Sequence, residues 1–183
     1  MEPDFDKKVA ELKNKIKSFP DFPKPGILFW DIFSAVSDGP TCKLLQSLLI
    51  QMVKHNFPDI EAVIGLEARG FLFSFSLAAE LGIGCLPVRK KGKLPGEVEA
   101  YRYDLEYGSD VLEIQKNTVH AGLKCLIVDD LIATGGSITA ATNLLRRCGA
   151  NVVGCVAVME LVKLNGRKNI PDDVPVYSLI KYD

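Results

Sequence analysis

The sequence predicts an α/β protein whose mainly parallel central sheet is flanked by helices. Short apolar segments with the length of β-strands alternate along the chain with longer segments of helical periodicity. A helix expected at 70–81 separates strands expected at 62–66 and 85–88, which is the order of a parallel crossover unit. A chain of 183 residues with 48% hydrophobic composition suffices for one packed core, so we expect a single domain over 1–183.

The segment 1–34 begins with a helix and continues with a proline-rich stretch. Apolar residues recur at helical spacing from Phe5 to Ile16, which predicts an amphipathic helix. The stretch FPDFPKPGILFWDI, at 19–32, combines prolines and a glycine with large apolar side chains, so we expect an ordered loop without regular structure. A second amphipathic helix is expected over 44–55.

The insertion 89–110 breaks the alternation of strands and helices. It carries lysines and arginines together with glycines and a proline, and loops of this length in compact domains are usually functional or disordered. The alternation then returns, with strands expected at 125–129, 152–159 and 176–180 and a helix expected at 137–148.

The composition argues against several function classes. Lys and Arg total 22 against 23 Asp and Glu, and the net charge of -1 gives no general attraction to nucleic acid or to an acidic membrane. No apolar run approaches the ~20 residues of a membrane span, and the N-terminus lacks a signal-peptide pattern, so we expect a cytoplasmic protein. The cysteines contain no CxxC pair, which favours free buried thiols over disulfides or a metal site.

The most informative segment is CLIVDDLIATGGSITAATNLLRRCG, at 125–149. An apolar strand ends in Asp129 and Asp130, and a Gly-Gly turn then opens a helix. The unpaired backbone N–H groups and partial positive charge of a helix start bind phosphate, and Thr134 and Ser137 add hydroxyl groups. The segment therefore predicts a phosphate site, although an ordinary turn with Ser137 as the N-cap also fits.

Asp129 and Asp130 stand where ligands bind in open parallel sheets, just beyond the carboxyl end of a strand. Adjacent carboxylates repel each other and need a positive or hydroxyl-rich partner, and a ribose diol fits that description. Because side chains alternate along a strand, another arrangement also fits, in which one carboxylate meets the ligand and the other joins a structural ion pair. The loop lacks the lysine of an ATPase phosphate loop and the glycine spacing of a dehydrogenase.

The run CLIVDDLIATGGS resembles the signature of the type I phosphoribosyltransferases, which use 5-phosphoribosyl 1-diphosphate as donor. The resemblance implies that family's fold, with a mobile hood loop formed by the insertion 89–110. It implies that Asp129 and Asp130 face the ribose hydroxyls and that the turn binds the 5-phosphate. The residues with the 5-phosphate role are Ala133, Thr134, Gly135, Gly136 and Ser137.

The resemblance extends to four further segments, SFPDFPKPGILF, GLEARGFLF, VRKKGKLPG and YDLEYG. They are similar to the members of the family that use adenine. The resemblance thus implies purine salvage, in which adenine and 5-phosphoribosyl 1-diphosphate give AMP and pyrophosphate. It also implies a homodimer and Mg²⁺ held mainly by substrate oxygens. Two alternatives are a transferase for another purine base and a non-enzymatic regulator that senses the donor.

The segment GLEARGF follows an expected strand and opens a helix, so it offers a second anion site. In the family it binds pyrophosphate, which gives this role to Glu67, Ala68 and Arg69. The family also implies a non-proline cis peptide at Glu67–Ala68. As an alternative, Arg69 is a surface cation.

The segment VRKKGKLPG resembles the family's hood. Closure of the hood would bring Arg89 and Lys93 to the pyrophosphate oxygens and would exclude water. Lys90 and Lys91 are expected to be solvated surface cations.

The base pocket is expected in PGILFWD, because a purine needs an aromatic face and backbone groups along its edge. Phe29 is the stacking candidate. By resemblance the backbone of Leu28 and Trp30 reads the adenine edge, and Leu131 covers the opposite face. Trp30 departs from the family, which commonly has Arg at this position. The alternative role for the apolar residues of PGILFWD is packing in the core.

The segment YDLEYG supplies Glu106 and Tyr107. Displacement at the anomeric carbon builds positive charge on the sugar while the purine loses a proton, and a carboxyl group beside the base can stabilise both changes. Glu106 is the catalytic candidate, with an exposed loop carboxylate as the alternative. Tyr107 is expected to close the loop.

Overall fold

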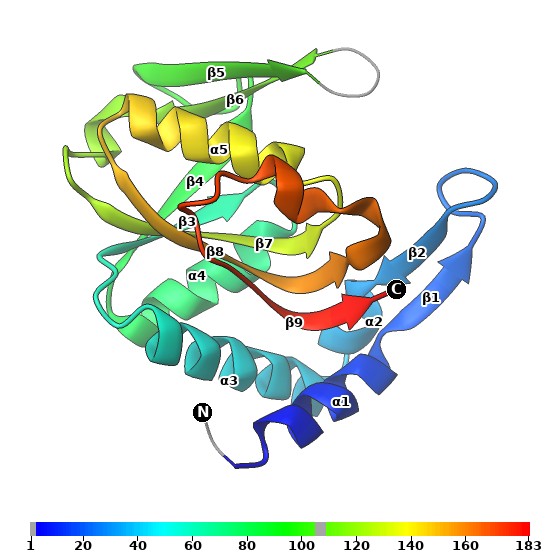
Figure 1. Cartoon of the computed structure of the whole chain (residues 1–183). Helices are drawn as coiled ribbons and strands as arrows, with labels where there is room; N and C mark the ends of the chain where they lie inside the picture. Colours follow the sequence, from blue (N-terminus) through cyan, green and yellow to red (C-terminus); the bar gives the residue numbers. More distant parts are fainter. Residues whose placement is uncertain (1–2, 105–108) are drawn as a thin grey trace. The chain divides into compact units, whose positions relative to one another are not determined.

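The computed structural model describes residues 3–104 and 109–183 (Figure 1). The chain divides into two compact units, Met1–His55 and Asn56–Asp183.

The first unit combines helices with a small antiparallel sheet. The helices are α1 (Phe5–Lys15), α2 (Ile32–Val36) and α3 (Gly39–Asn56), whose last residue already belongs to the second unit, and the strands are β1 (Lys17–Pro20) and β2 (Leu28–Asp31). Ser34 fastens α2 to the start of β1, because its Oγ accepts the Lys17 N–H at 2.9 Å. The Asp31 side chain caps α2 by accepting the Phe33 N–H at 3.1 Å.

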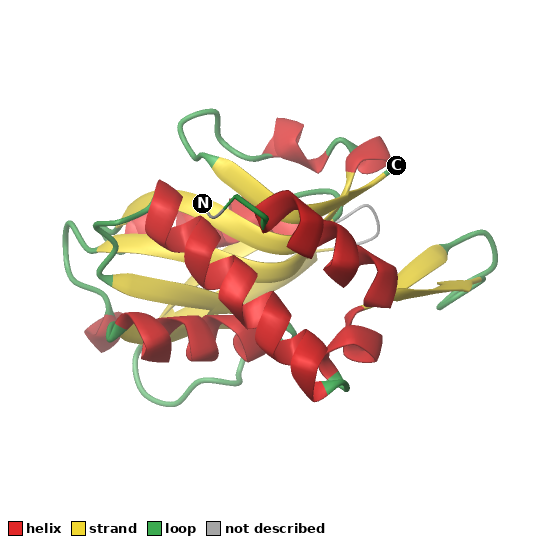
Figure 2. Cartoon of the chain, turned by 90° about the horizontal axis from the view of Figure 1, so that it is seen from below, coloured by secondary structure: helices red, strands yellow, loops and turns green. Residues whose placement is uncertain are grey.

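The prediction of an irregular loop at 19–32 was wrong, because β1 and β2 form a separate two-stranded ribbon (Figure 2). The prolines do not break this pairing because Pro20 ends β1 and the others lie in the turn, where no ladder N–H is needed. The Asp21 carboxylate accepts the Gly26 N–H at 2.7 Å and so closes the turn. Across the ribbon the rings of Phe22 and Phe29 meet edge to face at 5.0 Å between centroids.

The second unit is built on a seven-stranded sheet in the order β5-β6-β4-β3-β7-β8-β9. Strands β4, β3, β7, β8 and β9 are mutually parallel. Strand β6 runs antiparallel to both β4 and β5. This arrangement confirms the predicted α/β class. The strands are β3 (Ala62–Leu66), β4 (Gly84–Lys90), β5 (Val98–Asp104), β6 (Ser109–Gln115), β7 (Lys124–Ile132), β8 (Asn151–Leu161) and β9 (Val176–Tyr182).

Two helices cover opposite faces of this sheet, α4 (Gly70–Leu81) and α5 (Gly136–Arg147), and Figure 1 shows α5 above the strands and α4 below them. Side chains of β3 alternate accordingly: Ile64 belongs to the core cluster beneath α5, whereas Gly65 faces Ser74 of α4. The core on the α5 side includes Ile64, Cys125, Ile127, Ile138 and Leu144. Each such buried Leu or Ile contributes about 1.5–3 kcal/mol.

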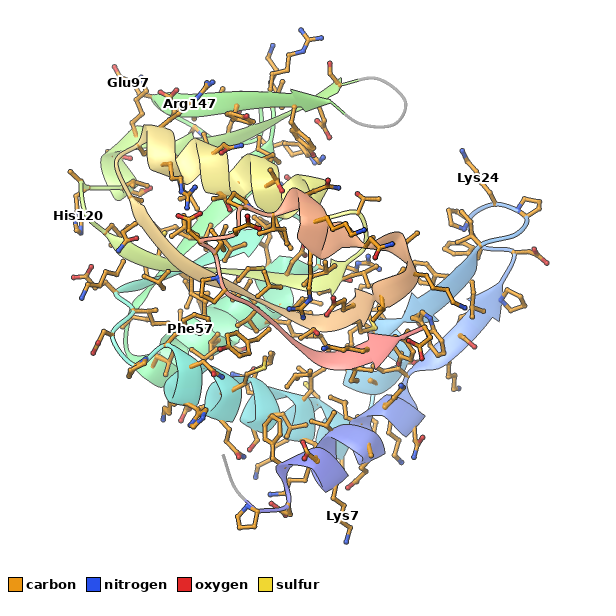
Figure 3. All side chains as sticks on the ribbon, in the orientation of Figure 1. Lys7, Lys24, Phe57, Glu97, His120 and Arg147 are labelled. Atoms are coloured by element: carbon orange, nitrogen blue, oxygen red, sulfur yellow. The ribbon has the colours of Figure 1, made fainter. Side chains whose placement is uncertain are left out.

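The insertion 89–110 contributes a hairpin rather than an irregular loop. Strand β6 pairs with β4 only at Arg89↔Glu113 and Lys90↔Leu112, while β5 lies against α5. Tyr101 of β5 accepts a hydrogen bond from Asn143 Nδ2 at 3.1 Å. The Arg147 guanidinium, from the end of α5 (Figure 3), lies 4.6 Å from the Tyr101 ring centre. Residues 105–108, between β5 and β6 in sequence, lie outside the described residues.

The cysteines are free thiols, and their environments differ. Cys125 and Cys155 are buried, whereas Cys42 of α3 is exposed. Burial raises the pKa of the Cys125 thiol to about 12 and also raises that of Cys155. Within residues 3–104 and 109–183, no helix is both long and apolar enough to cross a membrane.

Candidate active site

A small hollow lies where β7 gives way to α5. Strand β7 continues to Ile132, three residues beyond the expected strand end, so Asp129 and Asp130 are part of it. The turn that follows reaches Gly135, which has φ 79° and is the N-cap of α5. Gly135 has no side chain to accept the N–H groups of the first helical turn, and Ser137 lies inside the helix. The alternative of Ser137 as N-cap is therefore wrong.

The hollow has a volume of about 80 Å³. A helix start carries partial positive charge and unpaired N–H groups, so the hollow suits an anion such as a phosphate group. One wall is the carboxylate-bearing Asp129, which suits a hydroxyl-bearing ligand beside that anion. The lining residues are Asp129, Leu131, Ala133, Thr134, Gly135, Gly136, Ser137 and Ile138.

The two adjacent carboxylates have different surroundings. Asp130 is 4% exposed, and its Oδ2 lies 2.8 Å from Arg69 Nε. Asp129 is half-buried beside the hollow, and its Oδ1 accepts the Asp130 N–H at 2.8 Å. Burial raises the pKa of Asp129 well above its ordinary value, and the charge of Asp130 adds to this rise. This geometry matches the alternative arrangement expected from strand alternation, in which one carboxylate, here Asp129, stands at the ligand site and the other, Asp130, joins an ion pair.

The loop 67–69 lies next to this pair, and its Glu67–Ala68 peptide is cis, as the family resemblance implied. Helix α4 begins immediately after the loop, at Gly70, and touches β7 there. A Cβ at Gly70 would lie 2.8 Å from the Val128 carbonyl oxygen and 3.2 Å from Asp129 Oδ1. Only glycine permits this approach, and it brings the two helix-start loops together at the carboxyl ends of β3 and β7.

Glu67 accepts hydrogen bonds from three residues of the cationic segment 89–93. Its carboxylate accepts hydrogen bonds from Arg89 Nε at 3.2 Å, from the Lys90 N–H at 3.0 Å and from Lys93 Nζ. Burial by itself would raise the pKa of Glu67, but these donors outweigh it and lower the pKa to about 2. Arg89 and Lys93 are thus held beside the 67–69 loop by a carboxylate.

The expectation that Lys90 is a solvated cation was wrong. Its Nζ forms an ion pair with Asp110 and lies 3.1 Å from the Tyr103 hydroxyl, so it ties β4 to the insertion hairpin. The pairing exists because β6 returns antiparallel beside β4 and brings Asp110 within reach. Lys91 is exposed, as expected.

The predicted base-site residues are divided between the units. Leu28, Phe29 and Trp30 form most of β2 in the first unit, whereas Leu131 lines the hollow in the second. Their joint role therefore stays a prediction. Glu106 and Tyr107 lie outside the described residues.

Sequence reasoning missed a segment that contacts the turn. The short 3-10 helix η3 (Gly166–Asn169) lies against Ala133, Thr134 and Gly135. The signal in the sequence was slight, an Asn-Gly step at Asn165.

The sheet and its two helix-start loops define an α/β protein of the phosphoribosyl transferase class, whose family model, the phosphoribosyl transferase domain, matches residues 40–183. An adenine phosphoribosyltransferase from Drosophila pseudoobscura pseudoobscura is 51% identical over 175 residues, which cover 96% of each chain. One from Trichormus variabilis is 46% identical over 172 residues, covering 94% of this chain and 99% of the relative. The chain therefore belongs to the adenine phosphoribosyltransferases within the phosphoribosyl transferase family.

Solved structures agree with this assignment. Adenine phosphoribosyltransferase from Saccharomyces cerevisiae, complexed with an imino-altritol bisphosphate and adenine, matches with a TM-score of 0.90 and 43% identity. The match covers 94% of this chain and 98% of the yeast chain. The Giardia lamblia enzyme, complexed with 9-deazaadenine, matches with a TM-score of 0.88 and 31% identity over 96% of this chain and 98% of its own.

Proposed function

We propose that this protein transfers the 5-phosphoribosyl group of 5-phosphoribosyl 1-diphosphate to adenine, giving AMP and pyrophosphate in purine salvage. The observation that carries the proposal is the hollow at the start of α5 with Asp129 on its wall. An anion site beside a carboxylate matches a sugar phosphate, which presents a phosphate group and hydroxyl groups close together.

In this proposal the donor binds at both ends. The 5-phosphate occupies the hollow, and the ribose hydroxyls meet Asp129, with Asp130 behind it. The diphosphate binds at Glu67, Ala68 and Arg69. The side chains of Arg89 and Lys93 reach its oxygens. Holding the donor at two helix-start loops fixes the anomeric carbon, and such fixation supplies much of the catalysis.

The base is proposed to lie against Phe29, with the backbone of Leu28 and Trp30 along its edge and Leu131 on its other face. Glu106 is proposed as the catalytic carboxylate near the purine. Tyr107 is proposed to close the loop. The support for these roles is the family membership and the residue types at these positions.

Magnesium is proposed as the cofactor. Hard oxygen donors suit Mg²⁺, and the half-buried Asp129 carboxylate beside the expected ribose is an oxygen-rich neighbour that suits a cation held by substrate oxygens. When bound, Mg²⁺ neutralises charge that the diphosphate gains as it leaves. We propose that diphosphate and ribose oxygens, with water, hold it.

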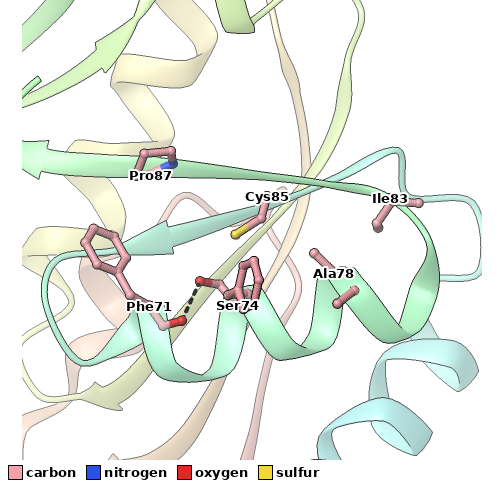
Figure 4. Close-up of a pocket in the computed structure, with 8 residues that line it drawn as sticks. Phe71, Ser74, Ala78, Ile83, Cys85 and Pro87 are labelled. Atoms are coloured by element: carbon pink, nitrogen blue, oxygen red, sulfur yellow. Dashed lines mark hydrogen bonds between the residues drawn. The ribbon is translucent and has the colours of Figure 1, made fainter. Parts of the chain in front are cut away.

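A homodimer in the cytoplasm is proposed, and helix α4 supports the dimer. Its sequence GFLFSFSLAAEL is apolar nearly all round, and such a helix needs cover on more than one side. Phe75 is 70% exposed and Leu72 is 50% exposed. Phe75 also lines a groove of about 480 Å³ between α4 and β4 (Figure 4). A second copy of the chain would cover this surface.

The test is steady-state turnover with adenine, hypoxanthine and guanine as acceptors. We expect adenine to be preferred and AMP formation to require Mg²⁺. We expect Asp130→Asn and Glu106→Ala to reduce AMP formation while circular dichroism shows a folded chain. Preference for a 6-oxopurine would contradict the base assignment, and donor binding without turnover of any base would favour the regulator.

A further inference from the structure

The segment η3 supports the anion hollow from outside. It lies far along the chain from the turn 133–135, yet it contacts the turn through hydrogen bonds and through direct backbone packing. None of its residues lines the hollow.

Asn169 forms hydrogen bonds both with the turn and with the start of α5. Its Nδ2 donates to the Thr134 carbonyl oxygen at 2.8 Å. Its own carbonyl oxygen lies 2.7 Å from the Thr139 hydroxyl, which is also 3.0 Å from the Gly135 carbonyl oxygen. Because a hydroxyl has one proton, Thr139 serves the closer acceptor, Asn169. Asn169 therefore joins the turn to the first turn of α5.

Gly166 packs its backbone against the backbone of the turn. A Cβ at Gly166 would lie 2.3 Å from the Ala133 carbonyl oxygen and 2.9 Å from the Gly135 nitrogen. A Cβ at Gly135 would lie 2.2 Å from the Gly166 carbonyl oxygen. Neither contact leaves room for a methyl group, so the shape of the turn depends on glycine at both positions.

An ion pair fixes η3 to the sheet. Arg167 Nε and Nη2 each lie 2.6 Å from a Glu160 carboxylate oxygen, and Nη1 donates to the Val176 carbonyl oxygen at 2.8 Å. Glu160 is 5% exposed, and Ser178 Oγ donates to it at 2.6 Å. The segment η3 therefore cannot shift without breaking a bidentate pair.

We propose that Asn169 and Gly166 are positioning residues for the anion hollow, which they shape without touching the ligand. The proposal rests on the proposed function, since the ligand is the 5-phosphate of the donor. The C=O and N–H of a trans peptide point in opposite directions. Holding the Thr134 carbonyl toward Asn169 therefore turns the Gly135 N–H away from Asn169 and keeps the carbonyl oxygen from repelling the phosphate.

The first test is the kinetics of Asn169→Ala. We expect the KM for 5-phosphoribosyl 1-diphosphate to rise about 3- to 10-fold, the range that follows from losing one hydrogen bond. The kcat and the KM for adenine should change less than about twofold, because once the donor is bound its second anion site still fixes the anomeric carbon, and Asn169 contacts neither the base site nor the reacting atoms. Asn117→Ala, an exposed asparagine of the 3-10 helix η1 (Lys116–Thr118), is the matched control and should leave all three constants unchanged.

The second test is calorimetric titration of ribose 5-phosphate, with the melting temperature of each variant measured in parallel. Asn169→Ala should bind ribose 5-phosphate about 3- to 10-fold more weakly. Gly166→Ala should bind it more weakly still, because the added methyl meets the Ala133 carbonyl. A variant with a lower melting temperature but wild-type affinity and donor KM would overturn the proposal. If the wild type binds ribose 5-phosphate but does not convert adenine, the proposed function fails and this inference survives.

Discussion

Asp129 and Asp130 are adjacent acids that share one close guanidinium, Arg69. Asp130 Oδ2 lies 2.8 Å from Arg69 Nε, whereas Asp129 Oδ1 accepts the Asp130 N–H. Burial raises the pKa of Asp129, so its ionisation opposes folding. In the proposed mechanism the ribose hydroxyls donate hydrogen bonds to the Asp129 carboxylate and so stabilise its charge.

At the residue scale we therefore expect Asp129→Asn to stabilise the free protein and to reduce turnover. With a folded pKa above the ordinary 3.8, the wild type loses stability as pH rises from about 4 through that folded pKa. Asparagine keeps the acceptor oxygen without the charge, and we expect a gain of about 1–3 kcal/mol at pH 7. Urea unfolding between pH 4 and 8 measures it, and Asp172→Asn, an exposed carboxylate, is the control. A loss of stability at pH 7 would contradict this view of Asp129.

Glu67 is the opposite case. Although burial opposes ionisation, its donors from Lys93, Lys90 and Arg89 lower its pKa to about 2 from an ordinary 4.5. Its ionisation therefore stabilises the fold fully above about pH 4.5, and this contribution disappears as pH falls toward 2. We expect Glu67→Gln to cost on the order of 2–3 kcal/mol at pH 7 and to flatten the acid limb of the stability curve. Acid titrations with Glu80→Gln as control test this, and an unchanged acid limb would show that the cluster does not form in solution.

At the scale of elements, periodicity predicted most strands and helices, since apolar runs such as 62–66 fold as strands of the same bounds. The hairpin at 17–31 was missed because proline and glycine were read as breakers, whereas here they lie at a strand end and in the turn. The pairing of β6 with β4 was missed because it spans only two residue pairs. No local pattern encodes so short a contact.

Tyr101 is the element-scale test of how the insertion hairpin is held. Tyr101→Ala removes the hydrogen bond from Asn143 and the ring beneath Arg147, so we expect a loss of about 1–2 kcal/mol. Amide hydrogen exchange should become faster in β5 and β6 than in β7. Glu97→Ala, just before β5, is the control, and equal exchange in both variants would mean that α5 does not hold the hairpin.

At the scale of the whole molecule, one local run, CLIVDDLIATGGS, located the turn that lines the hollow and the two adjacent carboxylates. The support from Gly166 and Asn169 was not predictable in the same way. It depends on a contact between segments that are distant in sequence, and a backbone contact between two glycines leaves no apolar pattern.

The proposed dimer makes a whole-molecule prediction. We expect Phe75→Lys to shift the protein from dimer to monomer, because it places a charge in an apolar surface. Light scattering after size exclusion measures the mass. Val162→Lys changes another exposed apolar residue, on the 3-10 helix η2 (Val162–Leu164), and should leave the mass unchanged. A wild-type chain that is monomeric at micromolar concentration would contradict the dimer.

The uneven burial of the thiols has a practical consequence. Maleimide reacts with thiolates, and burial keeps Cys125 and Cys155 protonated and shielded. Cys42 is exposed on α3, in the first unit. Once the half-buried Cys85 and Cys148 are replaced, a maleimide dye at Cys42 would mark the first unit alone.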